Sequence, residues 1–383
     1  MNESDVKAES PSIDHSLLRQ LVEPWFASLA DPLGSQVETL KVLLEGYART
    51  GYGREHGASS VEGIDGYRKS FPVSNYNTLS PYISRVRSGE YDALLSEPLA
   101  GWVMTRGTTG ASKVLPISES HLGQILTFGA RAVVNFALNK NPEVLETPVL
   151  NLNFPSAVHE MEMNGRREKY GYSSGTYARI HPELMGARLL PRQEEIDALG
   201  GGIAKADWEA RYELAYERAK GADIGSLIGV TPVMVGFADF LGKKHQVRPR
   251  DLWKPRALFC TSVAKIHTKY GPILHRLYGP SPLVEMYTAT EGAFAQQRDD
   301  LPYVSPNYDG YLFEVSTRAG MKMLHELRPN EWGKLIISTS ILPRYAIGDL
   351  VEALGKGYFR VFGRNKVFTR AEHRLFNLLA LRL

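Results

Sequence analysis

The chain has 383 residues, of which 43% are hydrophobic and 23% are charged. This composition is typical of a globular protein with room for two or three units, or for one large α/β body, and it excludes general disorder. Its 45 basic and 42 acidic residues leave a net charge of +3, which is too balanced to indicate nucleic acid or an anionic membrane as the main partner.

Cysteine content and the N-terminal segment bear on where the protein works. The single cysteine, Cys260, excludes an intrachain disulfide framework and a cysteine-based zinc site. Residues 1–24 are polar and charged, and they lack the basic and apolar regions of a signal peptide. Since no run of about 18 apolar residues occurs, we expect a cytoplasmic protein with no membrane partner.

The first predicted elements are helical. Beyond a polar end of about a dozen residues, helical spacing of apolar side chains runs over residues 16–51. Within this stretch Ser35 and Glu38 read as a capping box, with Ser35 as the N-cap. Residues 72–82 are interrupted by prolines, which predicts a connector that leads into a short helix.

Short apolar runs then alternate with helical stretches. A Gly-Gly-Gly sequence at residues 200–202 lies between helical stretches and reads as a surface loop. The alternation predicts a mostly parallel sheet covered by helices. Strands are expected at residues 102–104, 148–154, 227–235, 257–261 and 283–288, and helices at residues 118–137 and 209–220.

The pattern changes near residue 305. Tyr311, Phe313 and Val315 alternate with polar neighbours, and two further strand-like runs follow at residues 335–339 and 358–362. This alternation of apolar and polar residues predicts an antiparallel meander. We therefore expect an α/β fold with mixed, largely parallel sheets covered by helices, and a smaller antiparallel β subdomain. The expected division is 1–304, 305–364, and a terminal helix or lid remnant at 365–383.

The most informative stretch is a loop rich in threonine and glycine between an apolar strand and a helix. Glycines let backbone N–H groups turn inward toward an anion, hydroxyls add donors, and a lysine adds a mobile charge. Its two glycines are too close together for a Walker A loop. The loop predicts a phosphate grip and consists of Thr105, Arg106, Gly107, Thr108, Thr109, Gly110, Ala111, Ser112 and Lys113.

This loop resembles the phosphate loop of the adenylate-forming superfamily, which includes acyl-CoA synthetases, peptide-synthetase adenylation domains, luciferases and plant-hormone-conjugating acyl acid amido synthetases. A Tyr-x-x-Thr/Ser-Glu motif follows from Tyr287 to Glu291, and a Tyr-x-x-Gly-Asp motif from Tyr345 to Asp349. A Gly-Arg hinge motif ends at Arg364. Each motif alone is weak, but all four occur in the superfamily's order.

Within the superfamily, the chain is most similar to the acyl acid amido synthetases. The similarity rests on residues 52–57, 71–76, 89–90 and 343–351, and it covers about residues 40–365. It implies ATP- and Mg²⁺-dependent activation of a carboxylic acid as an acyl-adenylate, with pyrophosphate release and acyl transfer to an amine. Transfer to the thiol of CoA or a carrier protein, and a non-catalytic nucleotide- or acyl-binding relic, remain alternatives.

The resemblance also implies roles for single residues. Thr105, Thr108, Thr109 and Lys113 would hold the outer phosphates, together with Arg106, Gly107 and Gly110 of the loop. A carboxylate beside phosphates repels them unless a cation lies between, so Glu291 is the expected magnesium ligand. The other expected contacts are Tyr287 with adenine, Asp349 with the ribose diol, Thr290 with the α-phosphate, Arg364 with ribose or phosphates, and Thr261 with the nucleotide or acyl group. Lys113, Thr290, Glu291 and Arg364 are the expected catalytic set.

Other constellations support rival functions less well. Residues 171–175 match Gly-x-Ser-x-Gly, but no apolar strand precedes them, which disfavours a hydrolase. His159-Glu160 has Met163 where a zinc protease needs histidine. Cys260 lies in an apolar run and reads as a buried, inert thiol. Residues 154–175 and 227–241 are the expected acyl pocket, where Met163, Met234 and aromatic side chains favour an apolar acid.

The C-terminal end departs from the superfamily pattern. Members carry a mobile lid domain after the Gly-Arg hinge, whereas nineteen residues (383 minus 364) follow Arg364 here. Three interpretations stay open: a partner protein supplies a lid or a carrier, the enzyme works without a lid, or the chain has kept only binding. The expected small-molecule partners are a carboxylic acid and an amine or thiol acceptor.

Overall fold

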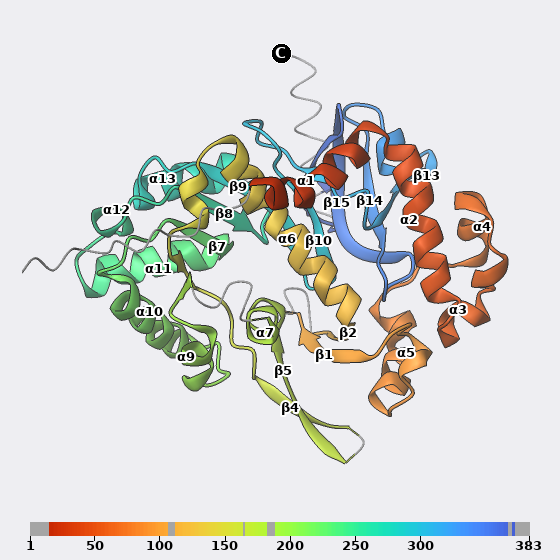
Figure 1. Cartoon of the computed structure of the whole chain (residues 1–383), viewed down its shortest axis with the longest axis horizontal. Helices are drawn as coiled ribbons and strands as arrows, with labels where there is room; N and C mark the ends of the chain where they lie inside the picture. Colours follow the sequence, from red (N-terminus) through yellow and green to blue (C-terminus); the bar gives the residue numbers. More distant parts are fainter. Residues whose placement is uncertain (1–14, 106–111, 164, 182–187, 367–369, 372–383) are drawn as a thin grey trace, which may run out of the picture.

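The computed structural model describes residues 15–105, 112–163, 165–181, 188–366 and 370–371. Helices and three sheets alternate along these residues, and Figure 1 shows their arrangement. The helices are α1 (His15–Ala30), α2 (Pro32–Tyr47), α3 (Gly51–Glu55), α4 (Gly63–Ser70), α5 (Tyr76–Arg87), α6 (Glu119–Asn139), α7 (Ser173–Ile180), α9 (Gln193–Ala198), α10 (Lys205–Ala219), α11 (Thr231–Lys244), α12 (Pro249–Leu252) and α13 (Gly271–Tyr278).

A seven-stranded sheet forms the helix-covered part of the molecule. Strands β6, β3, β7, β8 and β9 pair in parallel, and β10 and β11 add antiparallel strands at one edge. The predicted helix-covered, largely parallel sheet is thereby confirmed. The strand order is β11 (Ser305–Pro306), β10 (Gly292–Gln296), β9 (Leu283–Ala289), β8 (Ala257–Thr261), β7 (Ser226–Val230), β3 (Val149–Leu150) and β6 (Leu189–Leu190).

Helices cover both faces of this sheet because its central strands are apolar on both sides. On one face, Ala132 and Phe136 of α6 pack against Phe259 and Met286. On the other face, α10, α11 and α13 pack over a cluster that includes Leu258. Figure 1 shows α10 to α13 on one side of the molecule and α6 running across its middle.

A four-stranded sheet carries the predicted phosphate loop. Its order is β2 (Val114–Ser118), β1 (Leu99–Met104), β5 (Arg166–Tyr172) and β4 (His159–Met163). Strands β1 and β2 are antiparallel, and Met104 pairs with Val114. Thr105 therefore follows one strand of a β-hairpin, and Lys113 precedes the other.

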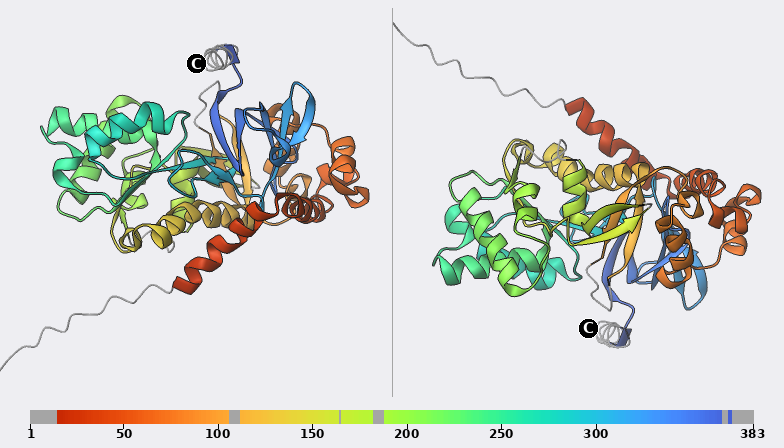
Figure 2. Two further views of the ribbon diagram at one scale, coloured as in Figure 1. Left: turned by 90° about the horizontal axis from the view of Figure 1, so that it is seen from above. Right: turned by 90° about the horizontal axis from the view of Figure 1, so that it is seen from below.

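A five-stranded antiparallel sheet follows within residues 312–364, as predicted. Its order is β13 (Gly320–Met323), β12 (Leu312–Thr317), β14 (Trp332–Ser338), β15 (Tyr345–Gly355) and β16 (Tyr358–Arg364). The N-terminal helices cover it, and in Figure 2 α1 lies along the outside of α6. The Gln36 side-chain amide in α2 donates to the carbonyl oxygens of Tyr308 (2.9 Å) and Tyr311 (2.7 Å).

Two local predictions were wrong, and one strand was missed. The N-cap of α2 is Asp31, which accepts a hydrogen bond from Gly34 N at 3.0 Å, and Ser35 lies inside the helix. Proline at the first helical position and aspartate before it begin the helix four residues earlier than expected. The helix expected at residues 118–137 is confirmed as α6, with Ser118 as its N-cap, but strand β2 lies between the loop and this helix and was not predicted. The expected strand at residues 227–235 ends at Val230, where α11 begins with Thr231-Pro232.

Among the helices of the described residues, none is both long and apolar enough to cross a membrane.

Candidate functional site

The motifs identified in the sequence converge from all three sheets. Lys113 immediately precedes β2, and Asp349 lies on β15 opposite Arg364 at the end of β16. Thr290 and Glu291 form the two-residue turn that joins β9 to β10. Because β8 and β9 are parallel, both end at the same edge of the seven-stranded sheet. Ligands of open α/β sheets bind at such carboxyl edges.

The ends of the predicted phosphate loop are held together. Thr105 N donates to the Lys113 carbonyl at 2.9 Å, and Lys113 N donates to Thr105 Oγ1 at 3.0 Å. The Thr105 hydroxyl thus helps to close the base of the loop. The predicted roles of Arg106, Gly107, Thr108, Thr109 and Gly110 fall outside the described residues.

The ammonium group of Lys113 contacts two aromatic side chains. Lys113 Nζ donates to Tyr345 Oη at 3.0 Å and lies 5.4 Å from the centre of that ring. It also lies 6.0 Å from the centre of the Tyr76 ring. Both distances are within the range of cation–π attraction. Sequence reasoning quoted Tyr76 and Tyr345 within runs that carry the family resemblance, but it gave neither residue a role.

Asp349 is held by a tyrosine and an arginine. Tyr287 Oη donates to Asp349 Oδ2 at 2.7 Å, and Arg364 Nε lies 3.1 Å from Asp349 Oδ1. Burial raises the pKa of Asp349, while Arg364 and the Tyr287 hydrogen bond lower it. Arg364 also donates to the Ile347 carbonyl at 2.8 Å, and its side chain is 46% exposed. The structure thus joins three of the predicted residues into one contiguous group with access from solvent.

The Tyr287 ring packs within an aromatic group. Its centre lies 5.5 Å from that of Phe294 and 6.2 Å from that of Phe359. Burial raises the pKa of Tyr287 well above its ordinary value, so the hydroxyl keeps its proton for Asp349. The ring is positioned by its neighbours before any ligand arrives.

Helix α7 braces the turn that carries Thr290 and Glu291. The Ser173 and Thr290 hydroxyls lie 3.3 Å apart, and Tyr177 Oη donates to the Thr290 carbonyl at 3.0 Å. Ser173 lies within the expected acyl pocket at residues 154–175, whereas Tyr177 lies beyond it and was not predicted as a site residue. The Thr290 carbonyl is therefore fixed, and its hydroxyl shares a proton with Ser173.

Glu291 is the most deeply buried acid of the group, with a 5% exposed side chain. Burial raises its pKa, Lys113 and Arg364 lower it, and Asp349 raises it. Two acidic and two basic side chains therefore interact electrostatically at the site. No described set of three or more His, Cys, Asp or Glu side chains gathers as a ready-made metal site. Mg²⁺ commonly takes one or two carboxylates and completes its shell with water and phosphate, which a single buried Glu291 fits.

Thr261, at the end of β8, is linked to the site by a contact with the neighbouring strand β9. Its hydroxyl lies 2.6 Å from the Thr288 hydroxyl, and its carbonyl accepts from the Thr231 hydroxyl at 3.0 Å. Ser262, which follows, has a left-handed backbone with φ of 75°. The chain thus leaves the sheet abruptly at the carboxyl edge, beside Tyr287 on β9.

The Gly-x-Ser-x-Gly match is structural in this fold. The preceding strand β5 is polar, in agreement with the sequence argument against a hydrolase. A Cβ at Gly171 would meet the Ser156 carbonyl carbon at 2.3 Å, and one at Gly175 would meet the Phe154 carbonyl oxygen at 2.1 Å. These two glycines are required by close backbone packing. Cys260 is buried, as predicted, and burial raises the pKa of its thiol to about 12.

A separate cavity of about 390 Å³ lies away from these residues. It is lined by α2, the start of α6 and residues 309–310. None of the predicted site residues lines it.

Comparison with known proteins agrees with this arrangement. Residues 27–191 match the family model described as the GH3 family N-terminal domain. No protein of the curated collections matches the chain. Three solved structures that resemble it share 14–17% of its sequence, a level at which similarity shows the fold alone.

These three structures illustrate the likeness. GH3.15 acyl acid amido synthetase has a TM-score of 0.71 and 17% identity over 93% of this chain and 72% of that chain. AtGH3.15 acyl acid amido synthetase in complex with 2,4-DB has a TM-score of 0.74 and 16% identity over 92% and 71%. 2-Hydroxyisobutyryl-CoA ligase in the postadenylation state with R3-HIB-AMP has a TM-score of 0.61 and 14% identity over 94% and 73%.

The family model and the structures confirm the resemblance that the motifs predicted. The fold is that of adenylate-forming enzymes, and its nearest likeness among the structures named here is to acyl acid amido synthetases.

Proposed function

We propose that this chain is an ATP- and Mg²⁺-dependent ligase that activates a carboxylic acid as an acyl-adenylate and transfers the acyl group to an amine. The observation that carries the proposal is the convergence of Lys113, Glu291, Asp349 and Arg364 at one carboxyl sheet edge. The GH3 family match and the likeness to acyl acid amido synthetases support it.

The reaction needs an activated acyl donor, because a free carboxylate would have to expel oxide. A carboxylate oxygen of the substrate attacks the α-phosphorus of ATP. The bond to the bridging oxygen of the β-phosphate breaks, and pyrophosphate leaves with its electron pair. Such a displacement depends on alignment and charge neutralisation rather than on covalent help from the protein.

The side chains divide these tasks. Lys113 and the Thr105 hydroxyl meet the outer phosphates, where charge accumulates as pyrophosphate leaves. The Thr290 hydroxyl reaches the α-phosphate from the turn that α7 braces. Asp349, held by Tyr287 and Arg364, accepts from the ribose diol. The exposed side of Arg364 meets ribose or phosphate, and Thr261 and Tyr287 border the base.

Glu291 is the group that would hold Mg²⁺. A carboxylate with 5% exposure is unfavourable when charged, which its raised pKa reflects. A divalent cation would favour the charged form and would neutralise phosphate charge during the displacement.

The acceptor decides between an amide and a thioester product. We propose an amine acceptor because both acyl acid amido synthetase structures cover more than 90% of this chain with TM-scores above 0.7. A thioester is the second candidate, since the fold is also similar to a CoA ligase. Mass detection of the product formed from one activated acid with an amino-acid mixture, CoA, or both distinguishes the two.

ATP–pyrophosphate exchange across a panel of carboxylic acids tests the activation step. Wild-type protein should exchange label with at least one acid, and Lys113→Ala should abolish the exchange. The exposed Lys41, which pairs with Glu38 on α2, provides the matched control. Lys41→Ala should exchange like wild type. If wild-type protein showed neither ATP–pyrophosphate exchange nor ATP binding, the proposal would be refuted.

A further inference from the structure

The ammonium group of Lys113 is held by a neutral phenol although carboxylates are nearby. Glu291 and Asp349 both act electrostatically with Lys113, yet within the described part of the chain its hydrogen bond goes to Tyr345 Oη. The bond from Lys113 to Tyr345 is charged on one side only, whereas a pair with a carboxylate would add the attraction between two opposite charges. Pairing with a carboxylate would therefore hold the lysine more firmly than its present partner does.

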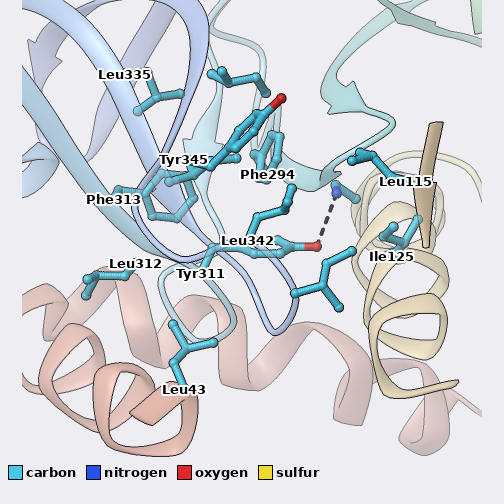
Figure 3. Packing of buried hydrophobic residues seen from close by; sticks show 14 of the residues in the cluster. Leu43, Leu115, Ile125, Phe294, Tyr311, Leu312, Phe313, Leu335, Leu342 and Tyr345 are labelled. Carbon is cyan, nitrogen blue, oxygen red and sulfur yellow. Dashed lines mark hydrogen bonds between the residues drawn. The ribbon is translucent and has the colours of Figure 1, made fainter. Parts of the chain in front are cut away.

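Tyr76 and Tyr345 together form what we call the aromatic clamp. Their rings lie 6.0 and 5.4 Å from Lys113 Nζ. Tyr76 Oη also accepts from Val114 N at 3.3 Å, one residue beyond the lysine. Tyr345 is fully buried in the cluster shown in Figure 3, where it packs with Phe294, Phe313 and Leu342. Burial raises the pKa of Tyr345, so its hydroxyl is uncharged at neutral pH.

The two halves of the clamp come from distant segments that are tied to each other. Ser74 forms a parallel bridge with Tyr345. Ser74 N donates to the Arg344 carbonyl at 2.9 Å, and Ala346 N donates to the Ser74 carbonyl at 2.9 Å. The Ser74 hydroxyl donates to the Pro343 carbonyl at 2.6 Å. Both tyrosines are thereby fixed by backbone contacts within two residues of their own positions.

A buried arginine locks this junction. Arg344 has a left-handed backbone with φ of 42°, a conformation that residues other than glycine rarely adopt. Its guanidinium donates to Glu314 at 2.8 and 3.1 Å, and to the carbonyl oxygens of Phe71 at 2.7 Å and Arg68 at 3.0 Å. These contacts anchor the strained residue next to Tyr345 against the segment that leads to Tyr76.

We propose that Tyr345 and Tyr76 are positioning residues that keep the Lys113 ammonium available for the outer phosphates by preventing its collapse onto Glu291 or Asp349. The inference rests on the proposed function of Lys113. A phenol is a weak partner that phosphate oxygens can displace, whereas a buried carboxylate would compete with them.

Calorimetric titration with inorganic pyrophosphate in the presence of Mg²⁺, and separately with adenosine, tests the clamp. Tyr345→Phe keeps the ring and removes the hydroxyl, and it should weaken pyrophosphate binding about tenfold or more while adenosine binding stays unchanged. Tyr76→Leu removes the other ring and should also weaken pyrophosphate binding, by a smaller factor. A general structural defect would lower binding of both ligands.

Tyr308→Phe is the matched control. Tyr308 is buried in the same cluster and packs against Phe313 and His325 instead of the lysine. It should bind both ligands like wild type. If wild type binds pyrophosphate and Lys113→Ala does not, equal or tighter binding by Tyr345→Phe and Tyr76→Leu overturns the clamp. If Tyr345→Phe fails to fold, Tyr76→Leu decides. If wild-type protein does not bind pyrophosphate, the proposed function of the loop fails instead.

Discussion

Replacing Arg344 by leucine should destabilise the protein strongly. Arg344 and Glu314 are 4% and 1% exposed, so Arg344→Leu leaves a buried carboxylate without its main partner. It also leaves the Phe71 carbonyl without this donor. Breaking a buried ion pair costs about 3–5 kcal/mol. Arg68, whose Nε lies 2.9 Å from Glu314, remains and places the expected loss near about 3 kcal/mol.

Urea unfolding followed by far-ultraviolet circular dichroism measures this loss. Arg54→Leu is the matched control, because Arg54 pairs with Asp92 at the surface, where both are more than half exposed. Such a pair contributes about 1 kcal/mol or less. The double variant Arg344→Leu/Glu314→Leu should recover part of the loss, because the buried carboxylate is removed and Arg68 keeps Asp65 at 3.4 Å. A free energy of unfolding for Arg344→Leu within about 1 kcal/mol of wild type would refute the reasoning.

Three further outcomes are expected. Glu291→Gln should abolish ATP–pyrophosphate exchange and leave the thermal midpoint within a few degrees of wild type; exchange at the wild-type rate would contradict a magnesium role. Burial raises the pKa of Glu285 to about 7, above its ordinary 4.5, so the folded state binds a proton that the unfolded state has released. The stability that this proton contributes is lost as the pH rises from 4.5 to 7, by at most about 3 kcal/mol. His267, 3.6 Å away, has a lowered pKa and changes stability in the opposite direction with pH. The difference in the free energy of unfolding between wild type and Glu285→Gln across pH 5–7 therefore isolates Glu285, and identical pH profiles would contradict this role. Cys260, with its pKa raised to about 12, should react with a thiol reagent at pH 8 only after denaturation, and rapid labelling of the native protein would be inconsistent with its burial.

The fold was predicted best where local pattern and burial agree. The expected strand at residues 257–261 coincides with β8, because every residue of that run is buried between two helical layers. Strand β2 was missed because Pro116 interrupts a short run. That proline is tolerated because β2 lies at the edge of its sheet, where an N–H group can be absent. The domain division at residues 304/305 stays a prediction.

Helix and strand were confused where an apolar run continued through a boundary. Residues 227–235 are apolar throughout, but Pro232 is compatible with a helix start, and α11 takes over at Thr231. Periodicity alone cannot separate a buried strand from the first turn of a buried helix. The wrong N-cap assignment of Ser35 has a similar cause, because a capping box requires only two residues at a fixed spacing.

The site was predictable only as far as its motifs extend. Glu291, Asp349 and Arg364 were found because their neighbours form recognisable patterns, and the structure brings them together. Tyr76 and Arg344 lie in runs that resemble the amido synthetases, but those runs assign them no role. The role proposed for them depends on the bridge between Ser74 and Tyr345, which are 271 residues apart in the chain, and no local spacing indicates that contact.

The cover that the first helices provide for the antiparallel sheet also constrains the order of folding. Trp25 donates to the Pro306 carbonyl, Gln36 to the carbonyls of Tyr308 and Tyr311, and Phe313 N to Gln36 Oε1, across separations of 272 to 281 residues. On the ribosome, α1 and α2 emerge before the sheet and can pack early against α6 and α4, but these hydrogen bonds form only after most of the chain has been synthesised. Contacts of such sequence separation slow folding and leave apolar surface exposed meanwhile. The N-terminal helices are thus made first and completed last.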